Sequence, residues 1–265
     1  MSTASGSFAD LKLRVISAVV LVVGAGGAVV FGGYAALALF VVAAALMTGE
    51  LGLMLTQDQP RGRAVSCAVV AGLSVLVVTW FADLPLWPVL GLAPVLGAGL
   101  LARDRVLFFF YCLAIVVAVA ALLHLRVFNG LPPVLWIITV VIASDIGGYF
   151  FGRILGGPKI LPKISPKKTW SGTLGGWILA ALVGTGFAWQ TGAPTGLIWL
   201  SVLMAVAAQA GDMVESRIKR HAGVKDSSAL IPGHGGLLDR FDALIGAALV
   251  AMLIALLPGQ PFGII

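Results

Sequence analysis

The chain alternates between long apolar runs and short polar connections. Nine apolar runs stand out, and most approach the roughly 20 residues that a helix needs to cross about 30 Å of hydrocarbon. They cover residues 13–31, 34–55, 64–81, 86–101, 106–125, 132–152, 172–190, 195–215 and 241–257. Because a helix satisfies its own backbone hydrogen bonds where no water is present, we interpret these runs as membrane-crossing helices.

The composition points to the same environment. Of the 265 residues, 60% are hydrophobic and 11% are charged, and the mean hydropathy is +1.06. A soluble globular domain carries roughly 25% charged residues. We therefore expect an all-α integral membrane protein with about nine transmembrane helices. The two cysteines, Cys67 and Cys112, lie inside separate runs and predict neither a disulfide nor a metal site.

The basic residues predict the orientation of the chain. Nine crossings place the N-terminus and the connections 56–63, 102–105, 153–171 and 216–240 on one side of the membrane, and this side holds all 17 lysines and arginines except Arg126. Positive residues are retained on the cytoplasmic side during insertion. We expect a multi-pass protein of the cell (inner) membrane, with a cytoplasmic N-terminus and the C-terminus outside.

Polar chemistry is divided unevenly along the chain. Residues 1–105 hold the first four runs, which are joined by short connections and carry few polar groups beyond Glu50 and Asp83, and this region is expected to form a scaffold. Residues 106–265 hold five runs and the two long cytoplasmic loops 153–171 and 216–240. We expect this second region to be catalytic, with its active site at the cytoplasmic face.

Acidic residues occur within or at the ends of three runs of the second region. Asp145 lies inside the sixth run, roughly 12 Å from its cytoplasmic end at 1.5 Å per residue. Asp212 and Glu215 end the eighth run, and Asp239 and Asp242 begin the ninth. Each of these pairs shares one helical face, so the carboxylates would repel one another. A bridging divalent cation would remove the repulsion, and an oxygen-only ligand set favours Mg²⁺.

Two basic loops are expected to face these acids. The first contains prolines that oppose helix formation, and the helix after it could be capped by Ser171 or Thr173. Its lysines and other hydroxyl residues are Lys159, Lys163, Lys167, Lys168, Ser165 and Thr169.

The second loop combines cations with glycines. Glycines at 233, 235 and 236 surround His234 and let backbone N–H groups turn toward an anion. The cations are Lys219, Arg220, Lys225 and Arg240. Glycines, cations and paired carboxylates at one membrane face predict a site for a polyphosphate held by a metal. The sequence contains no P-loop, Rossmann or kinase motif.

The same residues form a long, gapped pattern that resembles the phosphatidate cytidylyltransferases, also called CDP-diacylglycerol synthases. The pattern consists of Ser216, Lys219-Arg220, Lys225-Asp226, Pro232, His234-Gly235-Gly236, Asp239-Arg240 and Asp242. The segments "SDIGGYFFGR" (144–153), "ISPKKTWSG" (164–172) and "GDMVES" (211–216) are similar to the preceding motifs of this family. The resemblance covers roughly residues 140–245.

The resemblance implies an enzyme that transfers the cytidylyl group of CTP to phosphatidic acid and gives CDP-diacylglycerol and pyrophosphate. The expected cofactor is Mg²⁺, with a monovalent cation such as K⁺ as a second candidate. The expected partners are CTP, phosphatidic acid and the lipid bilayer, with a homodimer as one candidate assembly and no nucleic acid.

The resemblance and the residue chemistry together assign roles to individual side chains. Asp212 and Asp239 are the first candidates for metal ligands, followed by Asp145 and Asp242, and Lys225 and His234 join Asp212 and Asp239 as candidate catalytic residues. The candidate contacts to the phosphates of CTP or phosphatidate are Ser165, Lys167, Lys168, Lys219, Arg220, Lys225, Asp226, His234, Gly235, Gly236 and Arg240. Asp226 has two candidate roles, since it could hold Lys225 or receive the base or ribose.

The sequence departs from the family pattern at two positions, and two other functions stay open. Ser171 stands where the family usually has Glu, and Ser228 stands where it usually has Gly. One alternative is a CTP-dependent enzyme acting on another polar lipid such as a polyprenol. The other is an ion-coupled transporter, which typically shows internal repeats and a midplane site. We find no internal repeat, and the polar residues gather at one face.

Overall fold

The computed structural model describes residues 4–57, 60–81, 86–162 and 164–255. Most of this described part is α-helical. The helices are α1 (Ala4–Phe31), α2 (Gly33–Leu55), α3 (Arg61–Trp80), α4 (Leu86–Leu100), α5 (Arg105–His124), α6 (Leu131–Ile154), α7 (Trp170–Thr191), α8 (Gly196–His221) and α9 (Leu238–Ala255). A short π-helix, η1 (Leu125–Asn129), follows α5, and the strands β1 (Lys159–Leu161) and β2 (Ser165–Thr169) form a hairpin.

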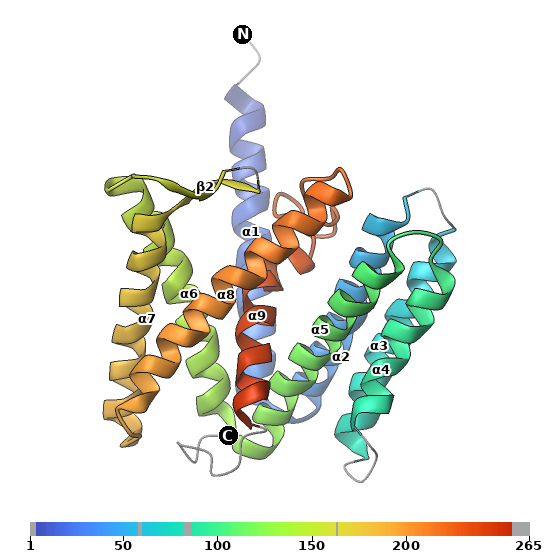
Figure 1. Ribbon diagram of the computed structural model, residues 1–265, viewed down its shortest axis with the longest axis horizontal. Helices are drawn as coiled ribbons and strands as arrows, with labels where there is room; N and C mark the ends of the chain where they lie inside the picture. Colours follow the sequence, from blue (N-terminus) through green and yellow to red (C-terminus); the bar gives the residue numbers. More distant parts are fainter. Residues whose placement is uncertain (1–3, 58–59, 82–85, 163, 256–265) are drawn as a thin grey trace. The chain divides into compact units, whose positions relative to one another are not determined.

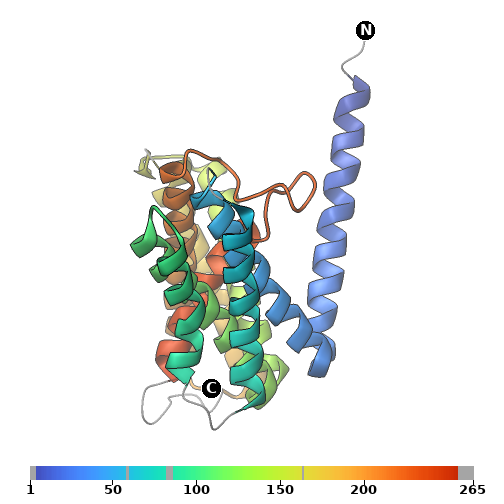
Figure 2. The ribbon, with the colours of Figure 1, turned by 90° about the vertical axis from the view of Figure 1, so that its right-hand side faces the viewer.

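The chain divides into two compact units. The first contains residues 1–123 and 222–240, and in it α1 packs against α2, α2 against α3, and α3 against α4 (Figure 1). Small residues allow close packing, since a side chain at Gly52 would lie 2.9 Å from the Cβ of Ala64. Figure 2 shows the connection between α8 and α9 extending toward α1, where the Ser17 hydroxyl donates to the carbonyl of Pro232 at 3.0 Å.

The second unit contains residues 124–221 and 241–265, and in it α6 packs against α7 and both pack against α8 (Figure 1). Glycines bring the helices close together in this unit as well. A Cβ on Gly147 of α6 would lie 2.7 Å from the carbonyl oxygen of Gly175 on α7. Small residues at such contacts are typical of membrane helices, whose association has no hydrophobic driving force in lipid.

Helices α8 and α9 meet through a pair of glycines. A Cβ on Gly211 of α8 would lie 2.5 Å from the carbonyl oxygen of Asp242 and 3.0 Å from the backbone nitrogen of Gly246. A Cβ on Gly246 would in turn overlap the carbonyl group of Ala207 on α8. This contact is therefore open only to residues without a side chain, and it fixes where α9 places Asp242 beside α8.

The first basic loop is folded as an antiparallel hairpin rather than as irregular chain. Lys159 pairs with Thr169, and prolines in the loop keep it from continuing α6. The prediction that Ser171 or Thr173 caps the following helix was wrong, because α7 begins at Trp170, earlier than the apolar run suggested. Thr169 is the cap, and its side chain accepts a hydrogen bond from the backbone N–H of Gly172 at 3.2 Å.

Each predicted apolar run overlaps a helix in the described part of the chain, although α1 begins at Ala4, well before residue 13, and α8 continues to His221, beyond residue 215. Six helical segments are long and apolar enough to cross a membrane: α2, α3, α5 together with η1, α6, α7 and α8. The apolar part of α1, Val15–Phe31, and α4 are shorter. The predicted end of the last run, residue 257, lies outside the described residues, as do Asp83 and Lys163. The protein is thus an all-α, multi-pass membrane protein.

The compact units do not follow the functional division that we predict at residue 105. Helix α5 and the connection between α8 and α9 belong to the first unit together with α1–α4. The division into scaffold and catalytic region remains a prediction, as do the number of nine crossings and the orientation of the termini.

The α8–α9 contact gives a testable prediction. Gly246→Ala should lower the free energy of unfolding by about 1–3 kcal/mol, because the added methyl group overlaps the backbone of α8 and forces the helices apart. Thermal unfolding of the detergent-solubilised protein measures the change. Gly186→Ala on α7 is the matched control, because a Cβ there meets no atom within 4 Å. Equal melting temperatures for the two variants would contradict the prediction.

Candidate functional site

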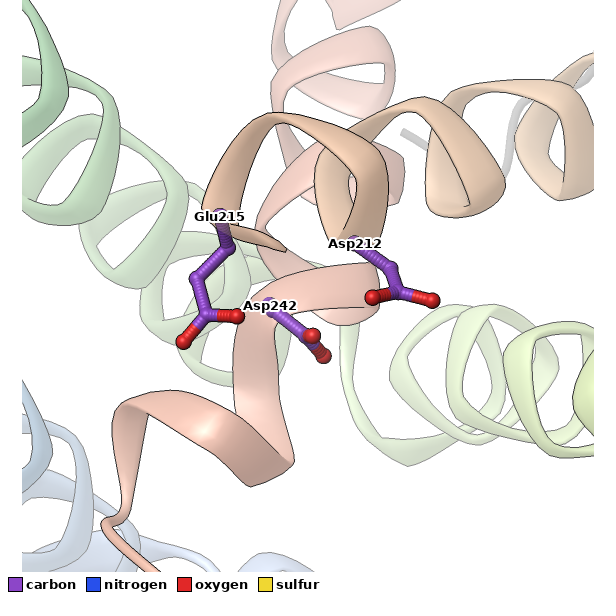
Figure 3. Close-up of side chains that lie close together, drawn as sticks. All are labelled: Asp212, Glu215 and Asp242. Carbon is purple, nitrogen blue, oxygen red and sulfur yellow. The ribbon is translucent and has the colours of Figure 1, made fainter. Parts of the chain in front are cut away.

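Three carboxylates gather where α8 and α9 meet. Asp212 and Glu215 lie one turn apart on α8, and Asp242 lies on α9. One carboxylate oxygen from each of the three lies within 4.8 Å of the others, and Figure 3 shows Asp242 between the two acids of α8. The predicted convergence of Asp212 and Asp242 is therefore present in the structure. Glu215, which sequence analysis placed on the same face as Asp212 without making it a ligand, completes the cluster.

Lysines neutralise part of this charge. The ammonium of Lys168 forms an ion pair with a carboxylate oxygen of Asp212. Lys219, one helical turn after Glu215, pairs with that carboxylate at 2.5 Å, and the Glu215 side chain is fully buried. Ser216 donates a hydrogen bond to Asp212 at 3.2 Å. Two of the lysines that we predicted as phosphate contacts thus lie against the acids that we predicted to be near a cation.

The chemistry of the cluster fits a hard divalent cation. Its three side chains offer only oxygen atoms, which Mg²⁺ prefers, and they come from two helices that the glycine contact holds together. Mg²⁺ is usually held by one or two carboxylates while water or substrate phosphate fills its other positions. Asp212 and Asp242 are only partly buried, which leaves room for such ligands, whereas Glu215 is buried and paired with Lys219.

A cavity of about 430 Å³ lies between α6, α7, α8 and the hairpin, all within the second unit. Asp145, which sequence analysis named as a candidate metal ligand, lines the cavity together with Lys167 and Lys168, two of the predicted phosphate contacts. Its lining residues are Ser144, Asp145, Gly148, Tyr149, Gly152, Arg153, Lys159, Pro166, Lys167, Lys168, Thr169, Gly172, Thr173 and Gln209. Four cationic side chains and one carboxylate make this cavity suited to an anionic ligand.

Sequence analysis missed several of the residues that line the cavity. Arg153 and Tyr149 lie one turn apart on α6, and the guanidinium of Arg153 donates to the Tyr149 hydroxyl at 2.5 Å. Gln209 of α8 donates to Ser144 at 3.2 Å and accepts from the indole N–H of Trp177 at 3.1 Å. Only the position of Arg153 and Tyr149 inside "SDIGGYFFGR" could have pointed to them.

The cavity and the acid cluster share one side chain. Lys168 lines the cavity, pairs with Asp212, and donates to the carbonyl of Gln209 at 3.4 Å. It therefore connects Asp145, inside the cavity, with the cluster at the end of α8. Ser165, also predicted as a phosphate contact, lies at the start of β2 and is not among the residues that line the cavity.

Asp239 has different partners from those that we predicted. Its carboxylate accepts hydrogen bonds from the backbone N–H of Ser227 at 2.9 Å, the Ser227 hydroxyl at 3.0 Å and the backbone N–H of Gly236 at 2.7 Å. All of these groups belong to the first unit. In this structure, Asp239 holds the connection between α8 and α9 in place, and its role as a metal ligand remains a prediction.

The other predicted residues of this connection lie mostly on its surface. Lys225 and Asp226 are exposed, and Arg240 donates through Nε to the carbonyl of His234 at 3.0 Å. The imidazole Nδ1 of His234 lies 2.9 Å from the hydroxyl of Ser17 on α1. Gly233 and Gly235 have positive φ angles of 75° and 83°, which explains the need for glycine on both sides of His234.

The chain is similar in sequence to known proteins. The chain matches the model of the cytidylyltransferase family over residues 12–257. It is 36% identical to the phosphatidate cytidylyltransferase of Brucella suis over 219 residues, which cover 79% of this chain and 72% of that protein. It is also 43% identical over 143 residues to the enzyme of the same name from Haemophilus influenzae, which covers 49% of this chain and 50% of the relative. The corresponding protein of Bacillus subtilis is 42% identical over 119 residues, or 44% of each chain.

Proposed function

Because this chain belongs to the cytidylyltransferase family, we propose that it transfers the cytidylyl group of CTP to phosphatidic acid, giving CDP-diacylglycerol and pyrophosphate. One observation carries the proposal beyond the family name. The cluster of Asp212, Glu215 and Asp242 is joined through Lys168 to a cation-lined cavity, which is the arrangement that a metal-bound polyphosphate and an anionic acceptor require.

Transfer of this kind needs little covalent chemistry from the protein. An oxygen of the lipid phosphate attacks the α-phosphorus of CTP in line, the bond to the β-phosphate bridging oxygen breaks, and pyrophosphate leaves. Catalysis then consists of positioning the two anions and stabilising the charge of the leaving group. In our proposal Arg153, Lys159 and Lys167 hold phosphate groups in the cavity, while Lys225, His234 and Arg240 keep their predicted role as phosphate contacts.

We propose Asp212 and Asp242 as the residues that hold Mg²⁺. When bound, the ion would supply charge neutralisation for the triphosphate and the leaving pyrophosphate. The fit rests on the oxygen-only donor set and on the partial exposure of the two aspartates. Asp239, a first candidate from the sequence, becomes a second candidate because of its hydrogen bonds to the loop, and Asp145 stays one. A monovalent cation such as K⁺ remains a prediction for which the side chains offer no separate argument.

Lys168 has a distinct part in this proposal. The ammonium of Lys168 pairs with Asp212, and a divalent cation held there would compete for the same carboxylate, so that Lys168 would be released. Since Lys168 also lines the cavity, its released ammonium is placed to bind a substrate phosphate. Lys168 would neutralise Asp212 before substrate arrives and bind a substrate phosphate afterwards.

The location of the reaction follows from the charge distribution in the sequence. We propose that the site faces the cytoplasm in the cell (inner) membrane, with the N-terminus inside and the C-terminus outside, because soluble CTP and a lipid headgroup can meet only at a water boundary. The homodimer remains a prediction. A polyprenol-type acceptor is the alternative that keeps the same chemistry, whereas membership of the family disfavours an ion-coupled transporter.

A direct assay tests the function. Purified protein with labelled CTP, phosphatidic acid and Mg²⁺ should form a lipid-linked cytidylyl product and pyrophosphate, and a chelator should abolish the product.

Asp212→Asn and Asp242→Asn should each lower turnover about 100-fold or more, since each removes charge that binds the cation. Asp104→Asn, in the connection before α5, is the control. A product with a polyprenyl phosphate but none with phosphatidic acid would overturn the assigned acceptor.

The competition at Asp212 gives a prediction that does not depend on turnover. Lys168→Met should raise the affinity of the nucleotide-free protein for Mn²⁺ several-fold, because the carboxylate loses a partly exposed ion pair that the metal otherwise displaces. Titration followed by electron paramagnetic resonance measures this affinity. Lys159→Met, which removes another cation of the cavity, is the matched control. Unchanged Mn²⁺ affinity in Lys168→Met would contradict the competition, whatever the activity.

The proposed orientation can be checked by labelling from one side. A cysteine at Gly62, where a Cβ meets no atom within 4 Å, should react with a membrane-impermeant maleimide only in inside-out vesicles. A cysteine at the exposed Thr195 should react only in right-side-out vesicles or intact cells. The native Cys67 and Cys112 are buried and provide the unlabelled background. Labelling of both sites from the same side would refute the orientation.

A further inference from the structure

Glu50, a buried acidic residue of the first unit, has no part in the proposed reaction. It lies on α2, in the region that sequence analysis assigned to the scaffold, and only 5% of its surface is exposed. A carboxylate removed from water is costly unless hydrogen bonds or opposite charges compensate it. The partners of Glu50 therefore indicate why the chain keeps it there.

Within the described part of the chain, Glu50 accepts hydrogen bonds from the connection between α8 and α9 and from the first residue of α9. One carboxylate oxygen accepts from the hydroxyl of Ser228 at 2.7 Å and from the backbone N–H of Leu237 at 2.9 Å. The other accepts from the hydroxyl of Ser227 at 3.2 Å and from the backbone N–H of Leu238 at 2.7 Å. Four donors directed at two oxygens form the pattern that suits an ionised carboxylate.

Two of these donors are backbone N–H groups at the start of α9. Leu237 and Leu238 stand at the N-terminus of α9, where backbone N–H groups have no partner within the helix and carry partial positive charge. Glu50 therefore acts as a cap supplied by another helix, 188 residues away from Leu238 in the sequence. The same carboxylate fixes both ends of the glycine-containing loop, at Ser227–Ser228 and at Leu237–Leu238.

The loop is fitted closely around this carboxylate. A Cβ on Gly236 would lie 2.6 Å from one oxygen of Glu50 and would overlap the hydroxyl of Ser227. Ser227 is 7% exposed and also contacts Asp239, so Glu50 and Asp239 hold the loop from two sides. The loop between these fixed points contains His234 and Gly235, two of the predicted phosphate contacts.

We propose that Glu50 is a positioning residue of the enzyme: it anchors the loop 227–238 to α2 and so sets the conformation in which His234 and its neighbouring glycines meet the substrate. The effect on catalysis rests on the proposed function, whereas the anchoring does not. Ser228 belongs to this anchor. It stands where the resembling family usually has glycine, so this chain adds a hydroxyl donor to the contact.

Amide hydrogen exchange tests the anchor independently of activity. Glu50→Gln replaces one acceptor oxygen by an NH₂ group that faces backbone donors. Peptides covering 227–238 should exchange about tenfold faster in this variant, because a hydrogen bond to a charged group is lost. Peptides from α3 should exchange as in the wild type. Thr48→Val is the matched control, since Thr48 is a buried polar residue of the same helix and its hydroxyl lies 4.0 Å from the thiol sulfur of Cys112.

Steady-state kinetics separates positioning from mere stability. Loss of a positioned loop should raise the KM for CTP about tenfold, since the phosphate contacts are no longer held in their binding conformation. A purely structural role would reduce the amount of folded enzyme and lower kcat without changing KM. Faster exchange with an unchanged KM would therefore overturn the positioning role. Unchanged exchange in Glu50→Gln would overturn the anchor itself.

A second variant decides the question if Glu50→Gln does not fold. Ser228→Ala removes the hydroxyl that donates to Glu50 and accepts from the backbone N–H of Leu230, and it leaves the carboxylate and its backbone partners in place. It should accelerate exchange of the loop peptides several-fold, because one charge-assisted hydrogen bond is lost, and exchange equal to that of the wild type would contradict the proposal. If the wild-type protein forms no cytidylyl product, the proposed function fails, while the exchange measurements still determine whether Glu50 holds the loop.

Discussion

Repulsion between like charges governs the arrangement at the end of α8. The contact of Gly211 with the backbone of α9 brings Asp242 beside Asp212 and Glu215, so that three carboxylates lie within 4.8 Å. Such a cluster is stable when positive charge offsets the repulsion or when one carboxyl group keeps its proton. In the structure that charge comes from Lys168 and Lys219. Because the helix contact brings the carboxylates together, cations stabilise the cluster. These cations can be lysines, a metal ion, or first a lysine and then a metal ion.

The acidic residues of this chain meet two kinds of partner. Asp212 is paired with the ammonium of a partly exposed lysine side chain, the partner that we propose a metal would replace. Glu50 and Asp239 are held largely by backbone N–H groups, which cannot leave without unfolding the loop. The first kind suits a carboxylate that must take up a cation and give it back. The second kind suits a carboxylate that keeps a piece of chain in one conformation.

The helices and the meeting of Asp212 with Asp242 could be predicted from the sequence, whereas the contacts within the loop could not. The helices follow from hydropathy, because each is long enough to fill a membrane span by itself. The meeting of Asp212 with Asp242 follows from helical spacing at the ends of two neighbouring runs. The partners of Asp239 could not be predicted, because they depend on how the loop from Ser227 to Gly236 turns. Glu50 was still harder to place, since its donors lie 177 to 188 residues away. The hairpin was missed because strands of three and five residues leave no periodic signal among prolines.

Lys168 belongs both to the ion pair with Asp212 and to the lining of the cavity. Lys168 stands on β2, next to Thr169, which caps α7, so its backbone is fixed by the hairpin and by the helix that follows. Its side chain, in contrast, can pair either with the carboxylate of Asp212 or with an anionic ligand in the cavity. In the proposed mechanism, a cation bound by Asp212 would therefore change the charge that the cavity presents. Arrival of the metal-bound nucleotide would raise the affinity of the cavity for an anion, and this couples the binding of the two substrates through one side chain.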